Sequence, residues 1–247
     1  MGSALYPPFL LTMSHGTLYI VATPIGNLGD ITLRALETLR SVDAIYAEDT
    51  RVTGVLAARF SLGKPLFSYR ESAPRAVVEK AIADILRRLW DGQNLAYVSD
   101  AGTPGLSDPG SYLVQRVVEQ GEAVVPIPGV SALSTLVSIS GLPVYRPLFV
   151  GFLPKKKGHQ TLMKKLRESI VNETADALIF YESPERIVKL LEELMEWGIP
   201  MRACLGRELS KMHEELLRGS LQELYTDLSS RTQIRGEICM LIANQPV

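Results

Sequence analysis

The sequence is poor in cysteine and has no long apolar run. Its 247 residues include two cysteines, Cys204 and Cys239, which stand far apart and match no metal-ligand spacing. Two cysteines without a secretory signature favour a reducing, cytoplasmic setting, where disulfides are rare. No stretch of about 18 apolar residues occurs, so we expect no membrane-spanning helix.

Histidine is scarce as well. The three histidines, His15, His159 and His213, have neither the spacing of a zinc site nor that of a Ser-His-Asp triad. The sequence therefore predicts no metal site and no catalysis by such a triad.

An excess of either charge is also missing. Lysine and arginine number 26 and aspartate and glutamate 27, which gives a net charge of −1. The chain thus lacks the overall basic footprint of sequence-independent nucleic-acid binders, and any RNA contact must be local. One basic run stands out, Lys155, Lys156 and Lys157. It is a candidate contact to phosphates, with a solvated helix face as the alternative.

What is present predicts a two-domain globular protein. The length exceeds that of most single domains, and a Pro/Gly-rich stretch at residues 141–147 interrupts the pattern of elements. We expect a disordered extension at residues 1–15, an N-terminal α/β domain at residues 16–145 and a C-terminal α/β domain at residues 146–247. The extension has no basic region and too short an apolar run for a signal peptide.

Strand and helix patterns alternate along the first half. Apolar strand-like runs at residues 17–22, 44–47 and 95–98 are followed by loops and by helical patterns at residues 31–40 and 77–90. This alternation predicts an α/β fold whose N-terminal sheet is doubly wound and mostly parallel. Ligands of such sheets bind at the carboxyl ends of the strands.

Two loops rich in glycine and proline follow such strands. The first, residues 23–32, has only Gly26 and Gly29, so it is neither a full dinucleotide fingerprint nor a Walker loop. Asp30 stands there at the start of the expected helix, where an acidic residue suits the N-cap. The second, residues 98–110, can present backbone amides and carboxylates to a ligand. The alternative is a pair of turns whose aspartates bond their own backbone.

Polar clusters end several other strands. They are Glu48-Asp-Thr-Arg51, Tyr181-Glu-Ser-Pro184 and Arg207-Glu208. Exposed ion pairs contribute only about 0–1 kcal/mol, so a role in stability explains little. Function and turn chemistry both stay open for each cluster.

Taken together, these segments resemble the bacterial ribosomal RNA small-subunit methyltransferase I family. The resemblance covers the two loops, the three polar clusters, Pro128-Gly-Val-Ser-Ala132, Gly151-Phe-Leu-Pro154 and Gly236-Glu237, in order from about Gly16 to Ile242. It implies a tetrapyrrole-methylase-like fold of two α/β domains with the cofactor in the cleft between them, usually as a homodimer. It also implies the activity, S-adenosylmethionine-dependent 2′-O-methylation of a cytidine in 16S ribosomal RNA.

The resemblance also implies which residues contact S-adenosylmethionine. They are Pro24, Asp100, Gly102, Thr103, Ser131 and Ala132, with further contacts near Tyr181 and Gly236. The chain departs from the family after Tyr69, where it reads Arg70-Glu-Ser-Ala-Pro74 in place of a His-Glu-His-Asn-Glu run, so that only Glu71 is retained. Val130 also occupies a position that is often proline.

Methyl transfer to a ribose needs positioning and a general base for the 2′-hydroxyl. We expect Asp49, Glu182 or Glu208 to be this base, because each follows a strand. Arg51 and Arg207, with Lys155, Lys156 and Lys157, are the candidate substrate contacts. Two alternatives are a methyltransferase acting on a corrin or porphyrin precursor and a catalytically silent RNA-binding assembly factor with the same fold.

Overall fold

The computed structural model describes residues 15–244, and these residues form two compact units. The first comprises residues 15–22, Thr32–Asp100 and Pro104–Pro128, and the second Thr23–Ile31, Ala101–Thr103 and residues 129–244. The extension expected at residues 1–15 lies, apart from His15, outside the described residues. Among these residues, no helix combines the length and the apolar character needed to cross a bilayer.

The first unit is built on a parallel five-stranded sheet in the order β3-β2-β4-β1-β5. The strands are β1 (Thr17–Val21), β2 (Ala44–Ala47), β3 (Leu66–Ser68), β4 (Leu95–Val98) and β5 (Ala123–Ile127). β2 and β4 are buried along their whole length, which agrees with their apolar sequences. The expected α/β class with a parallel sheet is confirmed.

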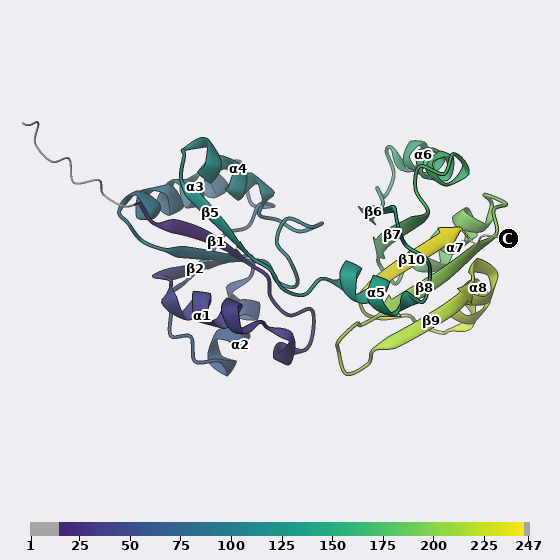
Figure 1. Cartoon of the computed structure of the whole chain (residues 1–247), viewed down its shortest axis with the longest axis horizontal. Helices are drawn as coiled ribbons and strands as arrows, with labels where there is room; N and C mark the ends of the chain where they lie inside the picture. The colour runs from purple at the N-terminus through teal and green to yellow at the C-terminus, as the bar shows by residue number, and fades with distance from the viewer. Residues whose placement is uncertain (1–14, 245–247) are drawn as a thin grey trace, which may run out of the picture. The chain divides into compact units, whose positions relative to one another are not determined.

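Helices cover both faces of this sheet (Figure 1). They are α1 (Leu33–Ser41), α2 (Thr50–Arg59), α3 (Arg75–Trp90) and α4 (Ser111–Glu119). α1 and α2 lie on one face, α3 and α4 on the other. The buried stripe of α3, which includes Ile82, Ile85 and Leu89, packs against the sheet residues Tyr46 and Tyr97. Helix periodicity in the sequence therefore gave the correct buried face.

Asp30 does not cap α1, contrary to our expectation. It ends the short 3-10 helix η1 (Leu28–Asp30), and the N-cap of α1 is Thr32, whose hydroxyl accepts a hydrogen bond from the backbone N–H of Ala35. Within the second unit, the Asp30 carboxylate instead accepts a hydrogen bond from the Ser210 hydroxyl. The helix begins later than the apolar pattern suggested because the chain first makes this tight turn.

The second unit contains a mixed sheet in the order β6-β7-β10-β8-β9, in which only β6 and β7 pair in parallel. The strands are β6 (Pro147–Phe152), β7 (Ala177–Glu182), β8 (Met201–Arg207), β9 (Glu215–Ser220) and β10 (Ile238–Asn244). The helices are α5 (Ala132–Ser140), α6 (His159–Val171), α7 (Ile187–Met195) and α8 (Leu221–Ser230). α6, α7 and α8 share one core with the sheet, while α5 packs on its other face.

The observed division of the chain differs from the boundary that we expected at residue 145, and the reason is the packing of α5. Leu136 of α5 is fully buried in the cluster that contains Cys204 and Leu241 of the second sheet. The long continuous segment of the second unit therefore begins at Gly129. The Pro/Gly-rich stretch at residues 141–147 is a connection inside it, between α5 and β6.

Candidate functional site

In the first unit, the carboxyl ends of β2 and β4 bring three acidic residues together. The two strands pair in parallel with Ala47 opposite Val98, so Glu48 and Asp49 follow one strand where Asp100 follows its neighbour. The backbone N–H of Asp49 donates to Oδ1 of Asp100 at 2.9 Å. In return, the backbone N–H of Asp100 hydrogen-bonds the Glu48 carboxylate. This interlock fixes the start of the second loop against the end of β2.

Asp49 is tied to two arginines. It is the N-cap of α2, and its Oδ1 accepts hydrogen bonds from the backbone N–H and the Nε of Arg51 at 2.9 and 3.0 Å. Nη2 of Arg51 lies 2.5 Å from Oδ2, and Nη2 of Arg70 lies 3.7 Å from the same oxygen. The Arg51 hydrogen bonds hold the pKa of Asp49 well below its ordinary value. Asp49 is thus an anchor for guanidinium groups, a weak proton acceptor at neutral pH.

Glu48 has the opposite environment. Its side chain is half-buried, and burial together with the negative charges of Asp100 and Asp108 raises its pKa. Within residues 15–244, no lysine, arginine or histidine nitrogen forms a salt bridge with it. We did not single out Glu48 in the sequence, because its signal is the burial and the charge of its neighbours, which the sequence does not show.

The far end of the second loop is held by Glu71, the one residue retained from the family's run. Its carboxylate accepts hydrogen bonds from the backbone N–H groups of Gly110 and Tyr112 at 3.0 and 2.7 Å. Gly110, the N-cap residue of α4, has φ +124°, and a Cβ there would lie 2.7 Å from the Tyr97 ring. Glu71 therefore caps α4 from a distant segment. Next to it, Nε of Arg70 donates to the Glu48 carbonyl at 3.0 Å.

In the second unit, three short segments expected to bind the cofactor lie together. Thr23 and Gly102 form an antiparallel bridge with two backbone hydrogen bonds, of 2.8 and 3.0 Å. The hydroxyl of Thr103 donates to the Val130 carbonyl at 3.2 Å. Gly102 has φ +74°, which a residue with a side chain would adopt only with strain. The segments that carry Pro24, Gly102 and Thr103, and Ser131 and Ala132 are thereby connected.

Ser131 carries an unused hydrogen-bonding group. Its Oγ is buried and has no partner among the residues that the structure describes, and it makes no capping bond to α5, the helix that it precedes. Leaving a buried hydroxyl unpaired costs about 1–3 kcal/mol. The structure thus leaves this Oγ with an unused hydrogen-bonding capacity, next to Val130, whose carbonyl accepts from Thr103.

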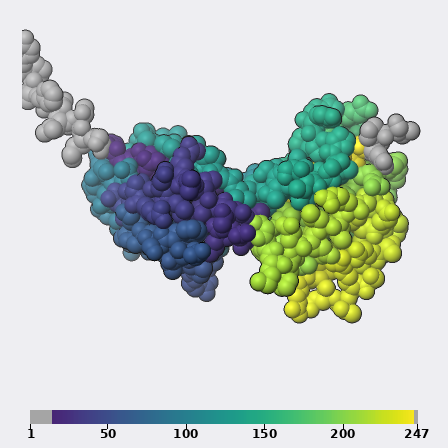
Figure 2. Space-filling model, turned by 60° about the horizontal axis from the view of Figure 1, so that its bottom comes forward, coloured from purple at the N-terminus to yellow at the C-terminus, as the bar shows by residue number. Residues whose placement is uncertain are grey.

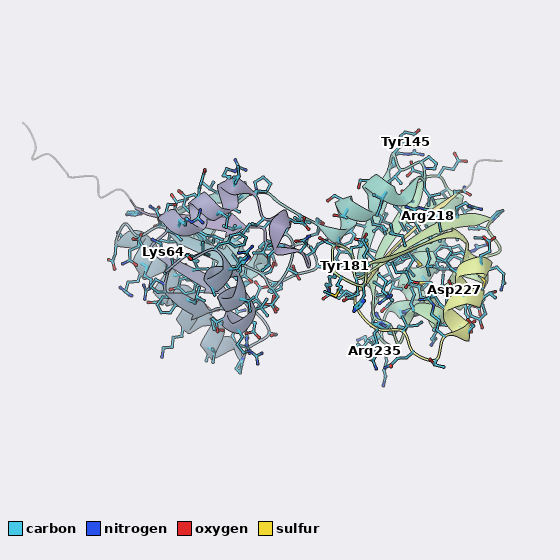
Figure 3. The ribbon with its side chains drawn as sticks, turned by 90° about the horizontal axis from the view of Figure 1, so that it is seen from below. Lys64, Tyr145, Tyr181, Arg218, Asp227 and Arg235 are labelled. Atoms are coloured by element: carbon cyan, nitrogen blue, oxygen red, sulfur yellow. The ribbon has the colours of Figure 1, made fainter. Side chains whose placement is uncertain are left out.

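Glu182 is a buried structural carboxylate. Its side chain is only 2% exposed, and Oε1 accepts hydrogen bonds from the backbone N–H of Ser183 at 2.6 Å and from Nε of Arg186 at 2.7 Å. Tyr181, labelled in Figure 3, packs edge-on against Phe149 and Phe152. Glu182 orders the turn between β7 and α7 within the second unit, whereas Asp49 belongs to the first unit.

Glu208 is held in a turn after β8. Its Oε1 accepts hydrogen bonds from Nζ of Lys211 at 2.9 Å and from the backbone N–H of Glu237 at 2.8 Å, and the Lys211 bond lowers its pKa. A Cβ on Gly236 would lie 2.4 Å from the Glu208 side chain, so Gly236 gives this carboxylate its room. These contacts explain both residues without a ligand.

The Arg207 guanidinium is bound within the protein. It donates to Oε2 of Glu215 at 2.7 Å, to the carbonyl of Arg235, a residue labelled in Figure 3, and to the carbonyl of His213. Three such bonds use most of its donors. Arg207, whose side chain is 19% exposed, is therefore less accessible to a phosphate than Arg51, which pairs with Asp49 but has a side chain that is 85% exposed.

Lys155, Lys156 and Lys157 form an exposed turn between β6 and α6, which we call the lysine turn. Figure 2 shows the teal and green region around α6 as a lobe on the surface of the second unit. None of the three lysines forms an ion pair with a carboxylate in residues 15–244. His159 holds the lysine turn in place. Its Nδ1 lies 2.9 Å from the carbonyl oxygen of Pro154, and its Nε2 lies 2.6 Å from Oε2 of Glu193.

Comparison with known proteins shows to which family the chain belongs. Residues 17–225 match the family model of the tetrapyrrole (corrin/porphyrin) methylases. The ribosomal RNA small subunit methyltransferase I of Thermotoga maritima is 40% identical over 230 residues, which are 93% of this chain and 99% of the relative. The protein of that name from Borrelia garinii is 44% identical over 92% of this chain and 98% of its own length. The chain belongs to the ribosomal RNA small subunit methyltransferase I family.

Solved structures agree with this fold. The methyltransferase CobJ superimposes on this chain with a TM-score of 0.70 at 18% identity, over 94% of this chain and 97% of CobJ. A uroporphyrin-III C-methyltransferase from Thermus thermophilus, complexed with S-adenosylhomocysteine, gives 0.63 at 18% identity, over 92% and 97%. The expected tetrapyrrole-methylase-like fold is confirmed, and the protein is a methyltransferase of this fold.

Proposed function

We propose that this methyltransferase transfers a methyl group from S-adenosylmethionine to the ribose 2′-oxygen of a cytidine in 16S ribosomal RNA. The observation that carries the proposal is the match, at 40% identity, to 99% of a relative named as a ribosomal RNA small subunit methyltransferase. The corrin and porphyrin enzymes share the fold at 18% identity, which gives their substrates no support here.

The residues of the second unit fit an S-adenosylmethionine molecule. The buried Ser131 Oγ lacks a partner among the described residues, and the left-handed Gly102 has no side chain that would hinder a ligand. We propose that Pro24, Gly102, Thr103, Ser131 and Ala132, with Asp100, hold the donor. When bound, it supplies a methyl group on a positively charged sulfur, which a carboxylate such as Asp100 attracts.

The remaining task of the protein is to hold the RNA and to accept a proton. Exposed cationic groups suit the phosphates, and these are Arg51, which is 85% exposed although it pairs with Asp49, and the lysine turn. Positioning the ribose oxygen in line with the methyl group supplies much of the rate, and a base near the 2′-hydroxyl supplies more. Protein contacts explain Tyr181 and Gly236, which are weaker candidates for binding the methyl donor, and Arg207, which is a weaker candidate for binding RNA.

The location of the protein, its form of substrate and its oligomeric state complete the proposal. We propose that the protein acts in the cytoplasm, on the RNA or on the small ribosomal subunit, as a homodimer. Size-exclusion chromatography with light scattering tests the dimer, since a mass near the 27.2 kDa of one chain would contradict it.

The experiment that tests the proposed function maps ribose methylation in small-subunit RNA from cells with and without this protein. We expect one cytidine to lose its 2′-O-methyl group and to regain it when the wild-type gene is restored. An unchanged methylation map would contradict the proposal. A restored map with a variant that does not bind S-adenosylmethionine would instead support the silent assembly factor.

A further inference from the structure

We propose that Glu48 is the catalytic residue that accepts the proton of the ribose 2′-hydroxyl. This inference rests on the proposed function and names a residue that the sequence did not single out as the base. It follows from where Glu48 lies, from the partners of the other acidic residues, and from the charges around its carboxyl group.

The first argument is position. β2 and β4 are neighbouring parallel strands, so Glu48 and Asp100 leave the sheet at the same edge, where α/β sheets bind ligands. The Glu48 carboxylate accepts the backbone N–H of Asp100, a residue proposed to contact the methyl donor. A base must lie close to where the methyl group is delivered, and Glu48 lies one hydrogen bond from that loop.

The second argument is that the other candidate bases are engaged. Asp49 is bound by Arg51, Glu182 by Arg186 and Glu208 by Lys211, each at hydrogen-bond distance. A carboxylate paired with a cation is a poorer proton acceptor, since the pair stabilises its charged form. Glu48, in contrast, forms no salt bridge with any described residue, and its side chain is half-buried, not sealed in the core.

The third argument is the local charge. The groups that act on Glu48 are Asp100, Asp108 and Arg70, and Glu48 in turn acts on the buried hydroxyl of Tyr97. Burial and the negative charges of the two aspartates raise the pKa of Glu48, and they outweigh the Asp100 backbone hydrogen bond and Arg70, which lower it. A base is most effective when its pKa lies closer to the working pH, so this environment improves Glu48 as a proton acceptor.

The step balances in atoms and charge. The ribose 2′-oxygen forms a bond to the methyl carbon while the bond from that carbon to sulfur breaks, and the sulfur keeps the electron pair. The 2′-hydroxyl proton passes to the Glu48 carboxylate, which later releases it to water. The products are the 2′-O-methyl ribose, neutral S-adenosylhomocysteine and one proton.

The test compares the wild-type enzyme with Glu48→Gln and Glu48→Asp in single-turnover methylation of the small ribosomal subunit. Glutamine keeps an oxygen that accepts the Asp100 N–H but cannot take a proton at neutral pH. We expect Glu48→Gln to lower the rate by about 100-fold or more, the usual range for loss of a general base. The dissociation constant of S-adenosylmethionine, measured by calorimetry, should change by less than about threefold.

The pH profile separates a base from a structural residue. The wild-type rate should fall as the pH falls through the raised pKa of Glu48, because the protonated group cannot accept a proton. Glu48→Asp should be slower but keep this acid limb, whereas Glu48→Gln should lose it. Glu119→Gln, which removes an exposed carboxylate from the far end of α4, serves as the matched control and should match the wild type.

Two results would overturn the inference while leaving the proposed function intact. One is a Glu48→Gln rate within about threefold of the wild type. The other is an acid limb that persists in Glu48→Gln. A wild-type enzyme that fails to methylate the subunit at all would instead contradict the proposed function.

Discussion

At the scale of single residues, the partners of a side chain decide its role more than its place in a motif. Glu48 and Asp49 are adjacent and both acidic, yet Arg51 lowers the pKa of Asp49 while burial raises that of Glu48. The sequence left function and turn chemistry open for this cluster, and within it we expected only Asp49 as a candidate base, beside Glu182 and Glu208 elsewhere. Which of two neighbouring carboxylates is paired depends on side-chain directions, which a one-dimensional pattern does not contain.

Ser131 provides a prediction at the same scale. Its buried hydroxyl lacks a partner among the described residues, so Ser131→Ala should leave the stability of the free protein unchanged or raise it slightly. If the hydroxyl bonds S-adenosylmethionine, its loss should weaken binding by about 3–10-fold, the worth of one hydrogen bond. Calorimetry measures the affinity, and thermal unfolding the stability.

Ser138→Ala is the control for this substitution. Ser138 lies on α5, the helix that Ser131 precedes, is exposed, and donates to the Thr135 carbonyl at 2.8 Å. Its removal should leave binding as in the wild type. Equal affinities for Ser131→Ala and Ser138→Ala would show that Ser131 does not contact the donor.

At the scale of elements, local patterns predicted the first unit better than the second. Apolar strands and the helical stripe of α3 are encoded by neighbours in sequence, and both formed as expected. β9 was missed because its sequence, Glu-Leu-Leu-Arg-Gly-Ser, lacks alternation and is completed by pairing with β8. α5 was assigned to the wrong side of the boundary, since the sheet on which it packs follows it in the chain.

Glu71 connects two elements, because it lies in the loop before α3 and accepts hydrogen bonds from the N-terminus of α4. Glu71→Ala should remove the acceptor for the N–H groups of Gly110 and Tyr112 and lower the unfolding free energy by about 1–2 kcal/mol, as loss of an N-cap does. Denaturant unfolding measures this difference. Glu119→Ala, at the opposite end of α4, should change the unfolding free energy by less than about 0.5 kcal/mol. Equal effects of the two substitutions would refute the capping role.

At the scale of the whole molecule, the net charge is near zero, so RNA binding must depend on local groups of basic residues. The lysine turn is exposed, and none of its three lysines forms an ion pair with a carboxylate of residues 15–244, so it is our candidate for this local contact. Each phosphate contact adds about 0.7–0.9 to the slope of log affinity against log salt. Replacing Lys155, Lys156 and Lys157 by alanine should therefore reduce that slope by about 2, measured by filter binding over a salt series.

A control for charge alone is the double substitution Lys64→Ala and Lys80→Ala in the first unit. It removes two lysines without touching the lysine turn and should leave the slope near the wild-type value. A slope that depends only on the number of lysines removed would mean that the lysine turn has no special part in RNA binding.

The central claim is that this chain methylates a ribose in the RNA of the small ribosomal subunit. The most direct measurement incubates the purified protein with small subunits that lack the modification and with S-adenosylmethionine carrying a labelled methyl group. Mass spectrometry of the RNA digest then locates the label. The account predicts label on the 2′-oxygen of one cytidine. Label on a base would contradict it. Unlabelled RNA would also contradict it, provided that the enzyme is shown to bind S-adenosylmethionine.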